Sequence, residues 1–139
     1  MTENREFARK LEARTRRFAI DVIRLSGKLP NSIECRVIRN QVTKSATSVW
    51  ANYREANRSR SKADFKSRIR ICESEASETQ YWLQIITEAD YAQQSDVKPI
   101  YEECSQLLAI FSSIGKKINT ICFHRFSILG TLAHFRHFI

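Results

Sequence analysis

The chain of 139 residues is poor in the residues that make tight turns, with only 3 glycines and 2 prolines. An all-β fold needs such residues in its many hairpins, so this composition argues against one. The chain is also not of the disordered class, because 42% of its residues are hydrophobic and 27% are charged. Its length suits one domain with a sizeable core. We therefore expect a single helical domain.

Long apolar runs and paired cysteines are missing as well. The longest uncharged run, residues 104–115, is too short to span a bilayer, and residues 1–9 lack the apolar segment of a secretion signal. The four cysteines include no Cys-x-x-Cys pair, which disfavours a zinc or redox motif. We expect a cytoplasmic protein with reduced thiols and no membrane partner.

Signatures of catalytic and cofactor chemistry are also absent from the sequence. No glutamate has a histidine three residues later, as di-iron helix bundles require, and three scattered glycines cannot form a phosphate-binding loop. Two sharper alternatives stay open: Glu75 and Glu78 as an acid–base pair, and a serine of the run 45–48 as a nucleophile, although no histidine or aspartate stands near this run in sequence. We expect a non-enzymatic protein without metal or cofactor.

Hydrophobic periodicity divides the chain into four amphipathic segments of roughly 25 residues. They cover about residues 3–26, 32–56, 61–91 and 96–121. Expected start signals are Asn31 for the second segment and Ser61 for the third. The third segment has an unbroken heptad pattern, which is typical of packed helices: Phe65, Ile69, Cys72, Ala76, Thr79, Leu83 and Ile86. The sequence predicts an all-α, up-down-up-down four-helix bundle over residues 1–123.

Two features of the second segment indicate how it packs. Residues 45–48 are small, which predicts close approach of a neighbouring helix. Its polar positions Asn52 and Glu55 stand among apolar residues, and buried polar groups need partners. We expect Asn52 and Glu55 to form an inter-helix polar network with Glu75 and Glu78.

Residues 124–139 differ from the rest and are expected to form a His/Phe-rich C-terminal tail. They hold all three histidines, three of the eight phenylalanines and Gly130. Docking of the aromatic residues on the bundle or on a partner subunit is one interpretation. Metal ligation by His134 and His137 and a membrane-surface helix are the alternatives, although no carboxylate or cysteine nearby completes a metal site.

The positive charge is concentrated in the first part of the chain. Residues 1–60 hold 14 Lys/Arg and 6 Asp/Glu, whereas residues 61–139 hold 9 of each, so the net charge of +8 lies in the first part. Such asymmetry indicates a polyanionic partner, with a solvated helical surface as the alternative. The candidate phosphate contacts are Arg54, Arg58, Arg60, Lys62, Lys66 and Arg70 around the second turn, and Arg9, Arg16 and Arg17 on the first segment.

Several stretches of the sequence resemble a known family. Residues 40–42 (NQV), 44–49 (KSATSV) and 52–56 (NYREA) resemble the central motif of bacterial four-helix-bundle proteins encoded in 23S rRNA intervening sequences. The match continues through Ser61, Asp64 and Phe65, and then through EASET (75–79) and YWL (81–83). The resemblance covers roughly residues 5–121, and the same superfamily includes the accessory variability determinant proteins of diversity-generating retroelements.

The resemblance implies a four-helix protomer that assembles into a homopentameric barrel. For the retroelement relatives it implies a basic surface that binds nucleic acid and a reverse transcriptase partner. For the intervening-sequence members, the family name gives a genomic location rather than an activity. The sequence departs from the family pattern beyond Ile121.

Together these observations predict an oligomeric accessory protein that binds nucleic acid through phosphate contacts. Structured RNA or a duplex is the expected ligand, because the basic stretch offers only Tyr53 and Phe65 for stacking on single strands. A reverse transcriptase is a further expected partner. The alternative is an oligomeric protein-interaction scaffold without nucleic-acid binding. Some apolar and aromatic residues lie outside the hydrophobic stripes of the four segments, and these are the expected subunit contacts: Ile20, Trp50, Tyr81, Trp82 and Ile85.

Overall fold

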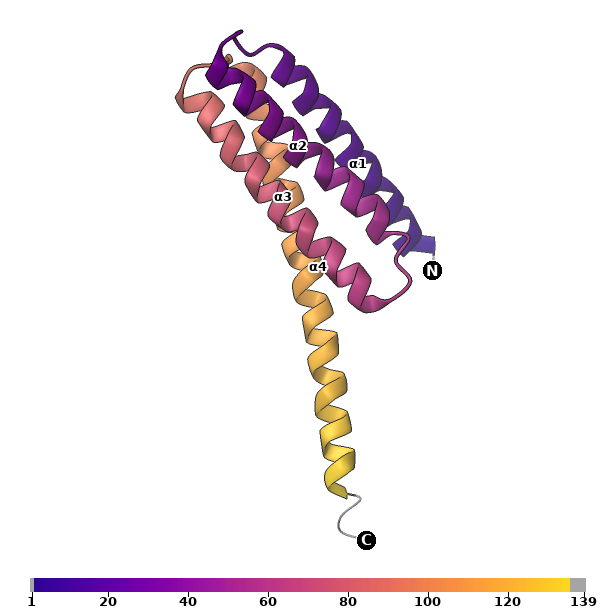
Figure 1. Cartoon of the computed structure of the whole chain (residues 1–139). Helices are drawn as coiled ribbons and strands as arrows, with labels where there is room; N and C mark the ends of the chain where they lie inside the picture. Colours follow the sequence, from indigo (N-terminus) through magenta and orange to yellow (C-terminus); the bar gives the residue numbers. More distant parts are fainter. Residues whose placement is uncertain (1, 136–139) are drawn as a thin grey trace.

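The computed structural model describes the backbone of residues 2–135 and the side chains of residues 2–119. Its helices are α1 (Thr2–Gly27), α2 (Ile33–Ala56), α3 (Lys62–Glu88) and α4 (Gln94–Phe135), and the described residues form no strand. Consecutive helices run in opposite directions and are joined by short loops (Figure 1). The predicted all-α four-helix bundle is confirmed.

Side-chain caps fix the starts of α2 and α3. The Ser61 hydroxyl accepts a hydrogen bond from the Asp64 backbone N–H at 3.1 Å, as the sequence predicted. For α2 the predicted cap was wrong by one residue. Ser32, not Asn31, is the N-cap, and its hydroxyl accepts from the backbone N–H of Cys35 at 3.1 Å.

Helix α3 ends earlier than the periodicity predicted. The backbone of Asp90 adopts a φ of 57°, in the left-handed region that stops a helix. The N–H of Tyr91 then bonds back to the carbonyl of Ile86 at 3.0 Å. Aspartate takes here the place that glycine usually has, so no glycine signal marked this end.

The core contains the residues that the helical periodicity selected. In α3 the predicted stripe from Ile69 to Ile86 is buried, and Phe65 is half-buried against it. Phe18 and Phe111 are among the largest fully buried side chains. Phe7 lies near the start of α1, at the end of the bundle, and is 52% exposed.

Helices α2 and α3 pack closely through small side chains. Ala46 and Ala76 are both fully buried. Beside them, the Thr79 hydroxyl lies 2.8 Å from the Ser45 hydroxyl, which is itself bonded to the Val42 carbonyl at 3.2 Å. Ser45 is 1% exposed, so its hydroxyl contributes to helix packing, as the small-residue run predicted.

The bundle has two diagonal pairs of helices. Helix α1 packs on α2 and α4, and α3 packs on α2 and α4, whereas the backbones of α1 and α3 do not approach each other closely within the described residues. The α1–α4 side includes an ion pair in which the Arg14 Nη2 lies 2.6 Å from the Glu103 Oε1. The same nitrogen donates to Gln106 at 3.0 Å. Features carried by α1 and α3 therefore lie at opposite corners.

Helix α4 is longer than the other three. The sequence predicts a bundle that ends at residue 123 and a tail at residues 124–139; in the structure the helical backbone of α4 continues without interruption to Phe135, past the ends of the other helices (Figure 1). The side chains of the proposed tail, including His124, His134 and His137, lie outside the described ones. Over the described part of the chain, no helix combines the length and hydropathy that a membrane crossing needs.

Candidate nucleic-acid interface

A five-residue turn, residues 57–61, connects α2 to α3 and is held by backbone hydrogen bonds. The N–H groups of Asn57, Arg58 and Ser59 bond to carbonyls in the last turn of α2 at 3.0–3.1 Å. On the other side, the Ser61 cap starts α3. These hydrogen bonds fix the backbone of the turn, which contains no glycine, so the side chains of the turn start from well-defined positions.

Three cations, which we call the turn cations, lie on this turn and at the first residue of α3, and they are free for a partner. Arg58, Arg60 and Lys62 are all exposed. No hydrogen bond or ion pair to another described residue engages their side chains. Clustered, unpaired cations on an exposed turn can neutralise several phosphates at once.

The candidates on α3 continue from the turn along one side of the helix. Lys66 is half-buried and Arg70 is exposed, and both line a shallow hollow of about 540 Å³. Glu75 lies at the far end of the same hollow. The hollow therefore passes from basic to acidic along α3, and its basic end is the part next to the turn cations.

Arg54 is engaged within the protein. Its Nε lies 3.9 Å from the Glu12 Oε1 on α1, and its guanidinium carbon lies 5.8 Å from the ring centroid of Trp50. Glu12 also accepts a hydrogen bond from the Asn57 side chain at 3.3 Å. Glu12 thus attaches the end of α2 to α1, and Arg54 is less free than the turn cations to bind a ligand.

The candidates on α1 form a second group, separate from those on α3. Arg9, Arg16 and Arg17 are exposed and have no described partner. Arg9 lies in the first half of α1, whose start is beside the α2–α3 turn (Figure 1), whereas Arg16 and Arg17 lie just past the middle of the helix. Since α1 and α3 are diagonal, the structure divides the predicted set into two groups that share only this end of the bundle.

The polar residue Asn52 has a partner that the sequence reasoning missed. Its Oδ1 accepts a hydrogen bond from Arg68 Nη1 on α3 at 3.1 Å, and its Nδ2 donates to the Ser48 carbonyl at 2.9 Å. Arg68 Nε also lies 3.9 Å from Asp64. The signal was available: a half-buried amide on a packed stripe needs a partner, and arginine has the reach to supply one.

The acidic residues of the expected network lie apart from Asn52. Burial, followed by the nearby Glu78 carboxylate, raises the pKa of Glu75, and the opposing Lys44 on α2 lowers it. Glu78 accepts a hydrogen bond from Trp82 Nε1 at 3.3 Å, and Glu55 is exposed. Among the described residues, no hydrogen bond joins Asn52 to Glu75 or Glu78, so the four residues do not form one network there.

The buried cysteines behave as core residues. Burial raises the pKa of both Cys72 and Cys104 to about 12, and each thiol donates to a backbone carbonyl of a neighbouring helix. These thiols are therefore neutral at physiological pH. Among the side chains that the structure describes, no group of three His, Cys, Asp or Glu residues is arranged to hold a metal ion.

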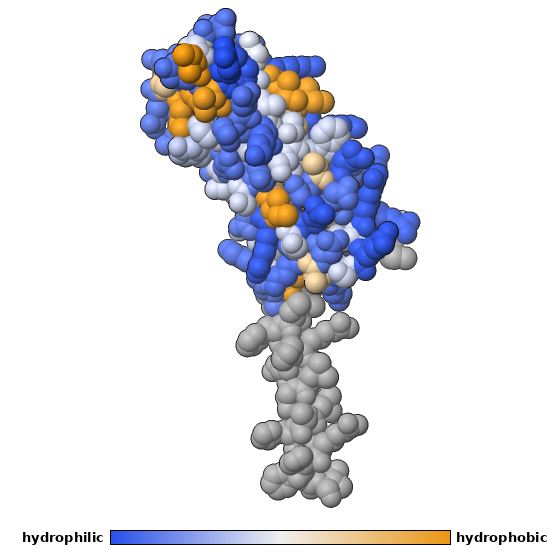
Figure 2. Space-filling model, in the orientation of Figure 1, coloured by the Kyte–Doolittle hydropathy of each residue, from blue (hydrophilic) through white to orange (hydrophobic). Residues whose placement is uncertain are grey.

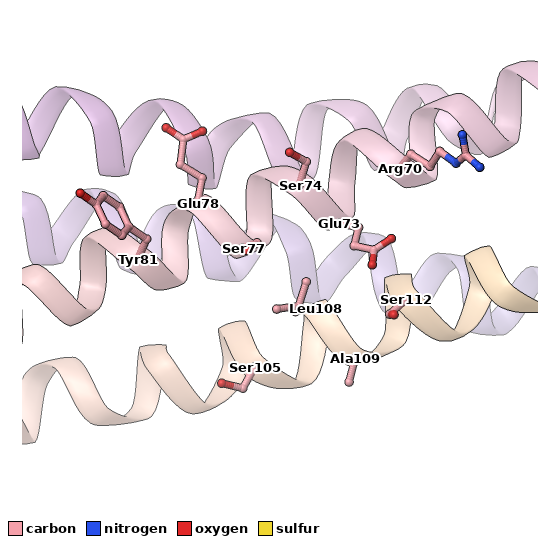
Figure 3. A pocket seen from close by; sticks show the side chains of 10 residues that line it. All are labelled: Arg70, Glu73, Ser74, Ser77, Glu78, Tyr81, Ser105, Leu108, Ala109 and Ser112. Atoms are coloured by element: carbon pink, nitrogen blue, oxygen red, sulfur yellow. The ribbon is translucent and has the colours of Figure 1, made fainter.

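A second surface feature is an open groove between α3 and α4 (Figure 3). Its volume is about 1040 Å³, and four of its ten lining residues are serines. Figure 3 shows the Glu73 carboxylate pointing towards α4, with Tyr81 at one end of the groove and Arg70 at the other. The groove is thus acidic in its middle and lies on α3, away from α1.

Comparisons with known proteins agree with this architecture. The family model of the 23S rRNA-intervening sequence protein matches residues 9–113. A solved structure from Bacteroides thetaiotaomicron, described as a protein with unknown function from the S23 ribosomal protein family, is 30% identical with a TM-score of 0.71. The similarity covers 76% of this chain and 98% of that one. A search of curated proteins found no match.

Proposed function

The chain belongs to the 23S rRNA-intervening sequence protein family, and from this premise we propose that it is a non-enzymatic, self-assembling accessory protein that binds nucleic acid through a basic surface in the cytoplasm. The nucleic acid is a duplex or a structured RNA, and it is contacted through its phosphates. The proposed assembly is a homopentameric barrel, and a reverse transcriptase is the proposed protein partner. These last two elements rest on the resemblance to the retroelement accessory proteins.

The observation that carries the proposal is the set of turn cations. Arg58 and Arg60 extend from the turn and Lys62 from the first residue of α3; all three are exposed and have no partner among the described residues. Cations that serve folding are engaged with carboxylates or amides, as Arg54 and Arg68 are here. The unpaired turn cations are therefore the best candidates for ligand binding.

The aromatic residues near the turn favour a duplex over a single strand. Tyr53 is 2% exposed and packs against Phe111 with ring centroids 5.8 Å apart. Phe65 is half-buried against the core. Neither ring is open to a base, and single-strand binding without sequence preference depends on such stacking.

A protein-interaction scaffold remains the second candidate, and the groove between α3 and α4 favours it. The groove presents carboxylates, small side chains and the exposed Tyr81, which is a surface suited to a protein rather than to a polyanion. In this case the turn cations would recruit an acidic protein instead of nucleic acid.

The test measures binding to a short RNA duplex and a DNA duplex of unrelated sequence over a range of salt concentrations. For the wild type, log K should fall linearly with log salt, by about 0.9 for each phosphate neutralised on DNA. The triple variant Arg58→Gln/Arg60→Gln/Lys62→Gln should bind both duplexes more weakly, with a slope flatter by up to about 2.7 for each bound chain.

The matched control removes three exposed cations at the opposite end of the bundle. Arg24→Gln/Arg36→Gln/Lys98→Gln has the same net charge as the triple variant, and its three sites lie near the end of α1 and the starts of α2 and α4. This control should keep nearly the wild-type slope. Equal losses in the two variants would mean that only net charge matters, and no binding at low salt by the wild type would favour the scaffold.

A further inference from the structure

The groove between α3 and α4 is complementary to the outer face of α1, and we propose that the groove of one copy receives α1 of a second copy. The inference rests on the self-assembly part of the proposed function and names the two surfaces that would meet. It takes Arg16 out of the nucleic-acid interface and places it in the contact between subunits.

The groove side supplies an unpaired carboxylate and room for a helix. Glu73 is half-buried, points across the groove, and has no hydrogen bond or ion pair to another described residue (Figure 3). Its Oε2 lies 4.0 Å from the position that a Cβ on Gly115 would occupy. Small wall residues such as Ser77 and Ala109 let another helix approach closely, and Leu108 and Tyr81 add apolar surface.

The α1 side supplies the matching cation and apolar residues. Arg16, Ile20 and Ile23 are spaced by four and three residues, so they form one stripe on the helix surface. They are exposed, with Ile20 at 38% and Ile23 at 44%, whereas Phe18 and Val22 of the opposite face are buried. Large exposed apolar side chains beside an unpaired cation are typical of an interface. On the face drawn in Figure 2, apolar surface forms separate patches within a hydrophilic surface.

The two surfaces lie at the same height along the bundle. Arg14 on α1 reaches Glu103 on α4, and Ser105 on α4 accepts a hydrogen bond from Gln80 on α3 at 2.9 Å. Side chains two residues from Arg14 are therefore level with the stretch of α3 that lines the groove. Two copies placed side by side therefore bring the α1 stripe against the wall of the groove that runs from Glu73 to Tyr81, and the proposed pairing within it is Arg16 with Glu73.

A second copy is the occupant that this chain itself supplies, because one molecule carries both the acidic groove and the basic stripe. The two surfaces are different and lie on different sides of the bundle, since α1 and α3 are diagonal. Contacts of this head-to-tail kind do not stop at a dimer but continue until they close into a ring or extend as a filament.

The experiment is a charge swap read by sedimentation velocity at micromolar concentration. The wild type should sediment as a multiple of the 16.2 kDa chain. Arg16→Glu and Glu73→Arg should each weaken self-association about tenfold or more, because like charges then face each other. The double variant should restore the assembly. Arg17→Glu is the control, since Arg17 is exposed on another side of α1 and adjoins Arg16 in sequence. Circular dichroism melting of every variant verifies the fold.

The possible failures separate the two proposals. If the wild type assembles and Arg16→Glu assembles equally well, the groove assignment is overturned and the proposed function stands. If single variants dissociate but the double variant is not restored, Arg16 and Glu73 are not partners and the inference fails. A wild type that sediments only at 16.2 kDa overturns self-assembly altogether, while the salt series still decides nucleic-acid binding.

Discussion

The buried hydroxyl pair between α2 and α3 allows a quantitative test of how these helices are held together. Thr79 Oγ1 lies 2.8 Å from both the Ser45 Oγ and the Glu75 carbonyl oxygen, and Ser45 Oγ lies 3.2 Å from the Val42 carbonyl oxygen. Each hydroxyl therefore has a backbone acceptor on its own helix, besides the contact that crosses between the helices. The perturbation is Ser45→Ala, Thr79→Val and the double variant.

The expected cost of each single variant is moderate because neither change strands a polar group. The single proton of the Thr79 hydroxyl is shared between the Ser45 Oγ and the Glu75 carbonyl, so after Ser45→Ala it can go to the Glu75 carbonyl alone. After Thr79→Val, the Ser45 hydroxyl still donates to the Val42 carbonyl. Each single variant should then lose about 1 kcal/mol, the net value of one hydrogen bond, rather than the larger penalty of an unsatisfied buried donor. The double variant should lose less than the sum by about 0.5–1 kcal/mol, because the shared contact is removed only once.

Urea unfolding monitored by circular dichroism gives the free energies of unfolding, and unchanged m-values license the comparison. Thr87→Val is the control: among the described residues, the Thr87 hydroxyl bonds only to the Leu83 carbonyl of its own helix, at 3.0 Å, so it should show no coupling to Ser45→Ala. Strictly additive losses at Ser45 and Thr79 would refute the shared bond. A loss above about 3 kcal/mol in either single variant would contradict the premise that the remaining hydroxyl keeps a hydrogen bond to a backbone carbonyl.

Three further results are expected. Ile69→Asp puts a charge at a fully buried site of α3 and should cost several kcal/mol, so its melting transition should be lost or strongly lowered, whereas an unchanged melt would contradict the core assignment. In a Cys122→Ser background, the three buried cysteines should react with a thiol reagent only after unfolding, and rapid native labelling would contradict their burial. Burial raises the pKa of Tyr53, Cys72 and Cys104 to about 12, above their values of 10.0 and 9.0 when exposed. The unfolded chain therefore loses these protons at a lower pH than the folded chain, so the urea midpoint should fall as the pH rises from about 8 to about 11. A midpoint that rises over this range would contradict the direction of these pKa shifts.

The helices and the core could be predicted because both follow from local spacing. Residues on the α3 stripe, such as Ile69 and Leu83, recur at the period of a helix, and burial of that stripe is what makes the helix stable. The ends of helices were less predictable. Asn31 and Ser32 both have side chains that can cap, and only the backbone conformation selects Ser32. The end of α3 depends on Asp90 taking a conformation that the sequence does not mark.

The candidate interface could be predicted only as a group of charges. The sequence gives the number of cations near the second turn, but whether a cation is free depends on residues that other helices bring beside it. Arg54 meets Glu12 of α1, and Arg68 meets Asn52 of α2. Such pairings depend on the three-dimensional arrangement of the helices, so sequence reasoning selected Arg54 and did not select Arg68.

The order of helix contacts has a consequence for how the chain folds. In the described part of the chain, three of the four helix–helix interfaces join helices that follow each other directly, and only the α1–α4 interface joins distant segments. Contacts between neighbours in sequence cost little loop-closure entropy, so topologies of this kind fold fast. During synthesis α1, α2 and α3 can pack in turn as each helix leaves the ribosome. The pairing of Arg14 with Glu103 then closes the bundle last, when α4 has been made.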